Sequence, residues 1–121
     1  MKPKTESEHQ IAVMAWAEEQ AANGRPELSL LFHVPNGEKR NRVTAIKLKK
    51  MGVKPGVPDL FLPVSRGTFH GLWVEMKKPG GTVSTKQLEW VLGLQAQGYR
   101  VDVADGFEAA RDTIEGYLCE T

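Results

Sequence analysis

The sequence predicts an α/β fold in which helices flank a central mixed sheet of four strands. Patterns typical of helices and short apolar runs typical of strands follow one another in the order α-β-α-β-β-α-β-α. The length of 121 residues suits one domain over residues 1–121, and a hydrophobic content of 40% is sufficient for a core. Charged residues stand within or beside two of the strand-like runs, where burial without a partner is costly.

The first predicted element is a helix over residues 6–22, which ends at Asn23-Gly24. A strand over residues 28–34 follows and is stopped by Pro35-Asn36-Gly37. The apolar face of the helix is expected to contain Ile11, Met14, Ala15 and Trp16.

The middle of the chain predicts a short basic helix over residues 40–51 and a Gly/Pro-rich loop over 52–58. Strands are expected over 59–63 and 71–77, with a turn at 65–68 between them. The buried residues of the basic helix are expected to be Val43, Ile46 and Met51.

The last part of the chain predicts a helix over residues 85–97, a strand over 99–103 and a final helix over 107–118. Ser84 and Gln87 have the spacing of a capping box at the start of the first of these helices. Its apolar face is expected to contain Leu88, Val91, Leu92 and Leu94.

Two short motifs, Pro58-Asp59 and Glu75-Met76-Lys77, carry the chemistry. Side chains alternate along a strand, so Trp73, Glu75 and Lys77 share one face. If the two strands pair, Asp59 approaches Glu75, and two such carboxylates repel each other unless a cation or a proton lies between them. Oxygen ligands favour a hard cation such as Mg²⁺. The alternative is a surface hairpin that carries an ordinary Glu–Lys pair.

The composition restricts the possible classes of function. The net charge is +1, so overall charge does not indicate a nucleic-acid partner. The one cysteine, Cys119, excludes an internal disulfide and a multi-cysteine zinc site. No apolar run is long enough to span a membrane and no signal peptide is visible, so the cytoplasm is the expected compartment.

Basic residues are concentrated just before the first motif. This block predicts a phosphate-binding surface, although a solvated helix face has the same pattern. Against Glu38 alone, residues 38–54 contain Lys39, Arg40, Arg42, Lys47, Lys49, Lys50 and Lys54.

A series of motifs resembles a known nuclease family. In chain order they are Glu6 or Glu8 in the first helix, the stretches 32–37, 54–60 and 75–77, Gln87, and the stretch 98–101. Together they resemble the PD-(D/E)XK nuclease superfamily and, more narrowly, the virus-type replication-repair nuclease (VRR-NUC) family in its stand-alone phage and bacterial form. The resemblance implies a restriction-endonuclease-like core and covers most of the chain.

The resemblance implies a role for each matching residue. Asp59 and Glu75 would bind Mg²⁺, for which Mn²⁺ substitutes, and the Met76 carbonyl would be an additional ligand. Lys77 would orient or deprotonate the attacking water and stabilise charge in the transition state. Gln87 would lie at the edge of the site, or would serve only the capping box with Ser84.

The glutamate that completes the site is left open between Glu6 and Glu8. Glu6 lies four residues before Gln10, a spacing found in the family, whereas Glu8 lies three residues before Ile11, in the register of related junction resolvases. Either can instead be a charge that is favoured at the N-terminus of a helix by its dipole.

Further residues are expected to contact DNA. His33 is expected at a strand end or substrate loop rather than among the metal ligands, because it lacks a second histidine at ligand spacing. Asn36 and Gly37 would offer donors to a phosphate or form a simple turn, and Trp73 is the tryptophan expected nearest the substrate. The expected DNA contacts are His33, Asn36, Lys39, Arg40, Arg42, Lys47, Lys50 and Lys54.

The expected function is therefore a Mg²⁺-dependent DNA endonuclease that prefers branched DNA such as four-way (Holliday) junctions. The resemblance places it in a bacterial cell or a phage-infected host, and cutting two strands symmetrically predicts a homodimer. The alternatives are a flap, single-strand or nicking nuclease within a larger complex, a non-catalytic DNA-binding module, and an interaction protein with the same fold.

Overall fold

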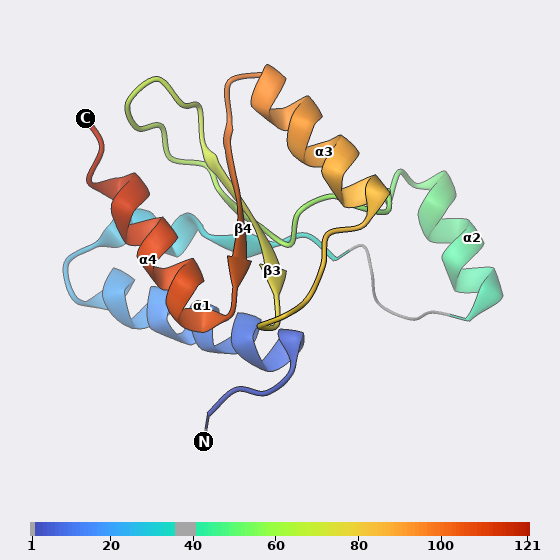
Figure 1. Cartoon of the computed structure of the whole chain (residues 1–121), viewed down its shortest axis with the longest axis horizontal. Coiled ribbons are helices and arrows are strands. Elements are labelled where there is room, and N and C mark those ends of the chain that lie inside the picture. Colours follow the sequence, from blue (N-terminus) through green and yellow to red (C-terminus); the bar gives the residue numbers. More distant parts are fainter. Residues whose placement is uncertain (1, 36–40) are drawn as a thin grey trace.

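The computed structural model describes residues 2–35 and 41–121. The secondary structure follows the predicted order, apart from the segment before the first strand (Figure 1). The elements are α1 (Glu6–Ala22), the 3₁₀ helix η1 (Pro26–Leu30), β1 (Phe32–His33), α2 (Arg42–Lys50), β2 (Leu60–Leu62), β3 (Leu72–Lys77), α3 (Thr85–Ala96), β4 (Arg100–Asp105) and α4 (Phe107–Leu118).

The four strands form the predicted mixed sheet, and their order in it is β1-β2-β3-β4. The pairs β1–β2 and β2–β3 are antiparallel, whereas the pair β3–β4 is parallel. This difference follows from the connections, because β2 and β3 are joined by a short turn and β3 and β4 by a crossover through α3. Leu60 pairs with Val74 in the β2–β3 register, so the preceding Asp59 is placed next to Glu75.

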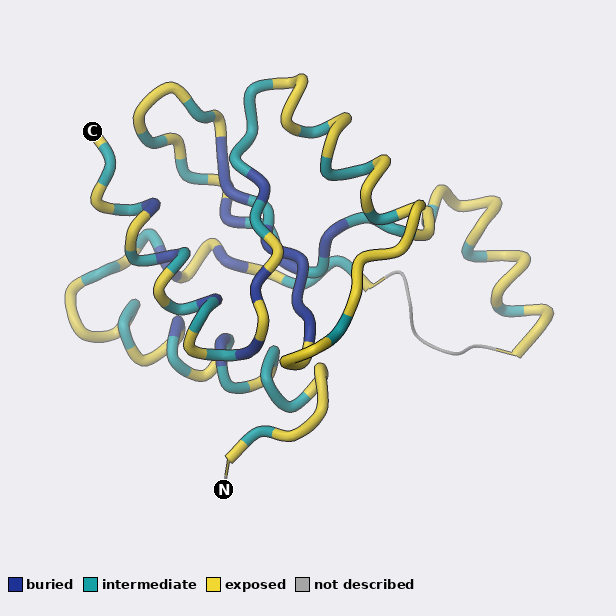
Figure 2. The backbone as a smooth tube through the Cα atoms, viewed as in Figure 1, coloured by how far each residue is buried: buried dark blue, intermediate teal, exposed yellow. Residues whose placement is uncertain are grey.

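The core lies between the sheet and the pair of helices α1 and α4. From the sheet, Leu72, Val74 and Met76 point into it, and from the helices, Val13 and Ile114 meet them. The buried positions follow the central strands and the inner sides of α1 and α4 (Figure 2). Helix α3 packs along β4 and sends Gln87 to Glu75, whose side chain points to the face opposite that core.

The predicted apolar face of α1 was only partly right. The buried residues of α1 are Val13 and Ala17, whereas Ile11 is 67% exposed and Ala15 is also exposed. Met14 and Trp16 lie half-buried against the core. Alanines and larger apolar residues occur all around this helix, so the sequence pattern alone does not select one face.

The predicted strand over residues 28–34 was also largely wrong. Its first part is the 3₁₀ helix η1, whose first turn contains Pro26, and β1 comprises only two residues. Leu28 and Leu31 are both buried, and their spacing of three residues suits a 3₁₀ turn, in which positions i and i+3 lie on one side. The short apolar run Leu30-Leu31-Phe32 nevertheless looks like a strand in the sequence.

Helix α2 forms where a basic helix was predicted, but its expected buried residues are exposed. Val43, Ile46 and Met51 are all exposed, with Val43 at 79%. The Asn41 side chain caps the helix by accepting a hydrogen bond from the Thr44 N–H at 2.8 Å. Figure 1 shows α2 projecting from the rest of the molecule, away from the sheet.

Helix α3 presents a different face to the molecule from the one expected. Val91 and Leu94 are half-buried, but Leu88 and Leu92 are exposed. Gln87 and Trp90 are half-buried instead. The inward stripe of α3 is therefore partly polar, because it covers the face of the sheet that carries Glu75 rather than the main core.

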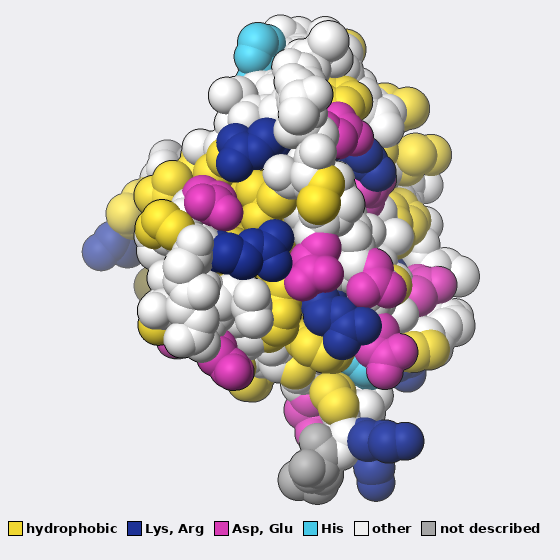
Figure 3. All heavy atoms as spheres, turned by 90° about the vertical axis from the view of Figure 1, so that its left-hand side faces the viewer, with side chains coloured by type: hydrophobic (Ala, Val, Ile, Leu, Met, Phe, Trp, Pro, Cys, Tyr) yellow, Lys and Arg dark blue, Asp and Glu magenta, His cyan; other side chains and the backbone are white. Residues whose placement is uncertain are grey.

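The surface seen in Figure 3 carries basic and acidic side chains in alternation. Two ion pairs tie together distant parts of the chain: Arg25 with Glu115 at 3.3 Å, and Arg100 with Glu120 at 3.0 Å. Within residues 2–35 and 41–121, none of the helices has both the length and the apolar character needed to cross a membrane.

Candidate metal and active site

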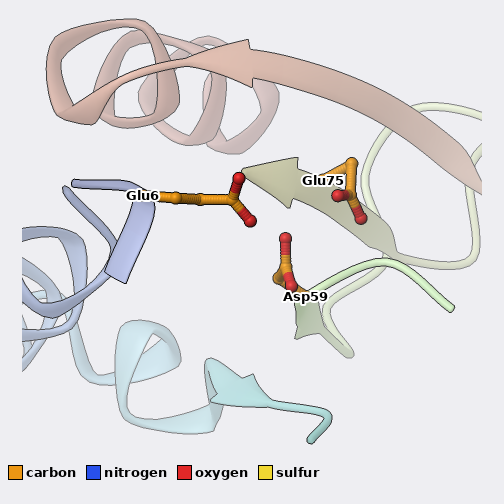
Figure 4. A group of neighbouring side chains, drawn as sticks. All are labelled: Glu6, Asp59 and Glu75. Atoms are coloured by element: carbon orange, nitrogen blue, oxygen red, sulfur yellow. The ribbon is translucent and has the colours of Figure 1, made fainter. Parts of the chain in front are cut away.

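Three carboxylates from separate parts of the chain converge near the end of β3. They belong to Glu6 in the first turn of α1, Asp59 just before β2, and Glu75 on β3. One carboxylate oxygen from each lies within 4.8 Å of the other two, and Figure 4 shows the three side chains turned toward one another. This spacing allows a single cation to contact all three.

Asp59 is held by hydrogen bonds from both neighbouring strands. Its Oδ2 accepts from the Met76 N–H at 2.8 Å. Its backbone carbonyl accepts from the Val34 N–H at 2.8 Å and from His33 Nδ1 at 2.8 Å. The pairing of β2 with β3 therefore brings Asp59 beside Glu75, as the sequence argument required.

Glu75 is 1% exposed, and its environment disfavours its charged form. Burial, together with the nearby Asp59 carboxylate, raises the pKa of Glu75 to about 8, while Lys77 acts in the opposite direction. Burial likewise raises the pKa of Asp59, against the effect of the hydrogen bond from Met76. Two carboxyls that resist ionisation, the buried Glu75 and the half-buried Asp59, form with the exposed Glu6 an oxygen donor set that fits a hard divalent cation such as Mg²⁺.

Two donors hold Glu75 Oε2. Gln87 Nε2 donates to it at 2.9 Å, and Lys77 Nζ lies 3.5 Å from it. The Lys77 side chain is nearly buried, and Gly81 lies so close that a Cβ there would be 3.4 Å from the Lys77 Cβ. The Lys77 ammonium is thereby kept beside the carboxylates.

Gln87 forms the capping box with Ser84 and also contacts Glu75 in the carboxylate cluster. Its Oε1 accepts from the Ser84 N–H at 2.9 Å, and its own N–H donates to Ser84 Oγ at 3.2 Å, which together form the predicted capping box. Its amide nitrogen remains available for Glu75. The N-terminus of α3 is therefore coupled to the site through one side chain.

The two candidate glutamates of α1 have different surroundings. Glu8 forms a capping box with Thr5, in which Glu8 Oε1 accepts from the Thr5 N–H at 3.2 Å and the Glu8 N–H donates to Thr5 Oγ1 at 3.1 Å. Glu6 is the glutamate that reaches Asp59 and Glu75. The geometry thus favours Glu6 for the site and Glu8 for the helix cap.

The other expected site residues that the structure describes are not part of this carboxylate cluster. Trp73 stacks on Phe61, with a centroid separation of 4.2 Å, and contacts Tyr99 edge-on, so it is part of an aromatic cluster. Arg42, Lys47 and Lys50 are exposed on α2, and Lys54 is exposed in the following loop. Asn36, Gly37, Lys39 and Arg40 lie outside the described residues.

Gly56 has a positioning role that the sequence reasoning missed. Its φ is +90°, and a Cβ at this position would lie 2.8 Å from the backbone carbon and oxygen of Lys86. The loop that leads to Asp59 thus rests directly on the first turn of α3, which carries Gln87. A glycine within the Pro55–Asp59 stretch was the available signal, since close backbone approach is a common reason for glycine.

Comparison with known proteins agrees with this geometry. The family model described as the VRR-NUC domain matches residues 4–108. A solved structure named "VRR_NUC domain protein" superposes with a TM-score of 0.81 at 36% sequence identity, covering 98% of this chain and 90% of the other. Among curated proteins, none matches the sequence. The family inferred from the motifs is confirmed, and the chain belongs to the VRR-NUC family of PD-(D/E)XK-type nucleases.

Proposed function

We propose that this protein is a Mg²⁺-dependent DNA endonuclease that hydrolyses phosphodiester bonds in branched DNA. The observation that carries the proposal is the convergence of the Glu6, Asp59 and Glu75 carboxylates with Lys77 beside them. A non-catalytic DNA-binding module has no need for three converging carboxylates, of which Glu75 is fully buried.

Glu6, Asp59 and Glu75 would hold the cation, and the Met76 carbonyl stays our predicted further ligand. When bound, Mg²⁺ supplies positive charge that lowers the pKa of water and offsets the negative charge of the phosphate. Mn²⁺ accepts the same oxygen ligands and should replace it. Glu8 supports the site indirectly, by capping the helix that carries Glu6.

Lys77 acts on the reacting groups in this proposal. Its ammonium orients the attacking water and stabilises the charge that develops on the phosphate. Its distance of 3.5 Å from Glu75 Oε2 places it next to the metal-binding carboxylates. Gln87 is a positioning residue, because its hydrogen bond fixes the Glu75 carboxylate relative to Lys77.

Branched DNA is the proposed substrate class because recognition can rely on phosphate positions and on the shape of the DNA. Arg42, Lys47 and Lys50 on the projecting helix α2, together with Lys54, offer contacts to the backbone. His33 is proposed to hold Asp59 in position through the hydrogen bond that its Nδ1 donates to the Asp59 carbonyl.

We also propose that the working form is a homodimer. One active site cuts one strand at a time, so paired cuts across a four-way junction need two sites.

The proposal is tested with end-labelled four-way, flap and linear duplex substrates, incubated with Mg²⁺ or with EDTA. Wild-type protein should cleave only with the metal, and branched substrates should be cleaved faster than the linear duplex. Asp59→Asn should abolish cleavage while DNA binding remains, because this change removes a metal-binding charge but preserves the size of the side chain. Normal cleavage by this variant, or cleavage in EDTA, would refute the metal-site assignment.

A further inference from the structure

A groove separate from the carboxylate cluster runs between the loop after α2 and helix α3. Two adjoining hollows of about 510 and 520 Å³ share Val53, Lys54 and Trp90 in their walls. A third hollow, of about 390 Å³, continues along α3 from Trp90 toward Gln97. We name this feature the Trp90 groove, after the side chain that lines all three hollows.

The walls of the Trp90 groove combine an apolar surface with an aromatic ring. Val34, Val53 and Val57 contribute aliphatic wall, and the Trp90 side chain is only half-buried. Within the described residues, no other aromatic ring stacks on the indole of Trp90, in contrast to Trp73. Each hollow has the size that holds a ligand of nucleotide dimensions, for which sites measure roughly 300–1,000 Å³.

The charges around the groove favour an anion. Among the described residues that line it, three carry a positive charge, Lys49, Lys54 and Lys86, and one carries a negative charge, Glu89. Glu89 is in turn 3.8 Å from the Lys86 ammonium, in an exposed pair. A positively charged groove with an aromatic ring in its wall is the arrangement that binds single-stranded nucleic acid, since the ring stacks on a base and the cations meet the phosphates.

The groove is connected to the candidate active site through three short links. Val57 lies two residues before Asp59, and the Val34 N–H donates to the Asp59 carbonyl. On the other wall, Gln87 lies one helical turn before Trp90 and donates to Glu75. The loop and α3, which hold Asp59 and Glu75 in place, therefore also form the two walls that flank Trp90.

We infer that the Trp90 groove binds an unpaired nucleotide of the DNA substrate next to the cut site, with its base stacked on the Trp90 indole and its phosphates near Lys54 and Lys86. The inference rests on the proposed function for the choice of DNA as ligand. It adds a specificity determinant: branched substrates with an unpaired nucleotide at the branch bind more tightly than substrates that are fully paired.

The experiment places 2-aminopurine, a fluorescent adenine analogue that is quenched by stacking, at successive positions in the unpaired arm of a flapped duplex. Binding is measured in EDTA, so that no cleavage occurs. Wild-type protein should quench the probe at one or two positions nearest the branch. Trp90→Phe should retain the quenching, since a ring remains, and Trp90→Leu should abolish it, since the volume stays apolar but the ring is lost.

Affinity provides the second measurement. Trp90→Leu should weaken binding of the flapped duplex by about 5- to 150-fold, which corresponds to ~1–3 kcal/mol for one stacked base. Its affinity for a fully paired linear duplex should stay at the wild-type level. Leu92→Ala, which changes an exposed side chain on the same helix, is the matched control and should behave as wild type.

Absence of quenching at every position, quenching that persists in Trp90→Leu, or an equal loss of affinity for paired and unpaired DNA would overturn the groove assignment. These outcomes are separable from failure of the proposed function. A wild-type protein that cleaves with Mg²⁺, and a Trp90→Leu variant with unchanged substrate preference, would refute the groove alone. Trp90-dependent quenching without any Mg²⁺-dependent cleavage would support the groove and refute the nuclease proposal.

Discussion

At the residue scale, two glutamates in the same helical turn have separate tasks. Glu6 reaches the other two carboxylates, whereas Glu8 closes the capping box with Thr5. The sequence reasoning left them open because both satisfy the preference for acidic residues at a helix N-terminus, and it did not use the capping-box spacing of Thr5 and Glu8. The decisive feature is Thr5, whose hydroxyl selects the residue three positions later as its partner.

This difference predicts that two matched substitutions affect the cleavage rate to very different extents. Glu6→Gln should reduce the rate of Mg²⁺-dependent cleavage by about 10²-fold or more, a loss typical of one positioned electrostatic group. Glu8→Gln should keep the cleavage rate within a few-fold, because glutamine also serves in a capping box. Single-turnover cleavage at saturating Mg²⁺ measures both, and a larger loss in Glu8→Gln would reverse the assignment.

The raised pKa of Glu75 predicts how the stability of the metal-free protein depends on pH. In the unfolded chain Glu75 ionises near its ordinary value of 4.5, but in the folded protein its pKa is about 8. Between these values the folded state holds a proton that the unfolded state has released, so the free energy of unfolding falls as pH rises. The limiting slope is about 1.4 kcal/mol per pH unit.

Urea unfolding in EDTA between pH 5 and pH 8 measures this effect, with the pH limits set by that pKa shift. The midpoint should fall with pH in the wild type, and the slope should be much smaller in Glu75→Gln, which has no proton to lose. Saturating Mg²⁺ should also flatten the wild-type profile, since the cation takes the place of the proton. A midpoint that rises over this range would contradict the prediction.

At the scale of elements, Gly56 joins the loop that carries Asp59 to the helix that carries Gln87. Gly56→Ala should destabilise the protein by about 1–3 kcal/mol and slow cleavage, because the methyl group meets the Lys86 backbone in a conformation that already disfavours alanine. Gly52→Ala is the matched control, since Gly52 has a φ of +105° but nothing within 4 Å of an added Cβ. Equal costs in urea unfolding would show that backbone strain alone is responsible.

Helix α2 predicts a specific effect of salt on DNA binding. Combined replacement of Arg42, Lys47 and Lys50 by glutamine should weaken all duplex substrates similarly. The slope of log affinity against log salt should become shallower by about 0.9 for each phosphate contact that is lost. Arg111→Gln on α4 is the control, because the Arg111 guanidinium is paired with Asp112 at 3.2 Å. An unchanged slope in the triple variant would leave α2 as a solvated helix.

The order of the elements and the two strand motifs could be predicted from the sequence because each has a local cause. Charges in an apolar run, the Ser84–Gln87 spacing and the turn residues all act over a few positions. The inner face of α1 could not be predicted, because Val13 and Ala17 are selected by what packs on them rather than by the pattern. Likewise, Leu28 and Leu31 enter the core from a 3₁₀ turn that resembles a strand in sequence.

At the scale of the whole molecule, the proposed paired cutting of a junction requires two copies of the chain. Sedimentation at working concentration should give about twice the chain mass of 13.4 kDa. Mixing wild type with Asp59→Asn should form heterodimers that nick four-way junctions but seldom cut both strands. A monomer that makes both cuts in one binding event would refute the dimer.

The convergence of Glu6, Asp59 and Glu75 from distant parts of the chain has a consequence during synthesis. Glu6 leaves the ribosome before Asp59 and Glu75, and these three carboxylates meet only when β3 has formed and α1 has docked on it. Lys77 and Gln87 follow later still. A nascent chain therefore carries no hydrolytic centre, and the capacity to cut nucleic acid arises only at the end of folding.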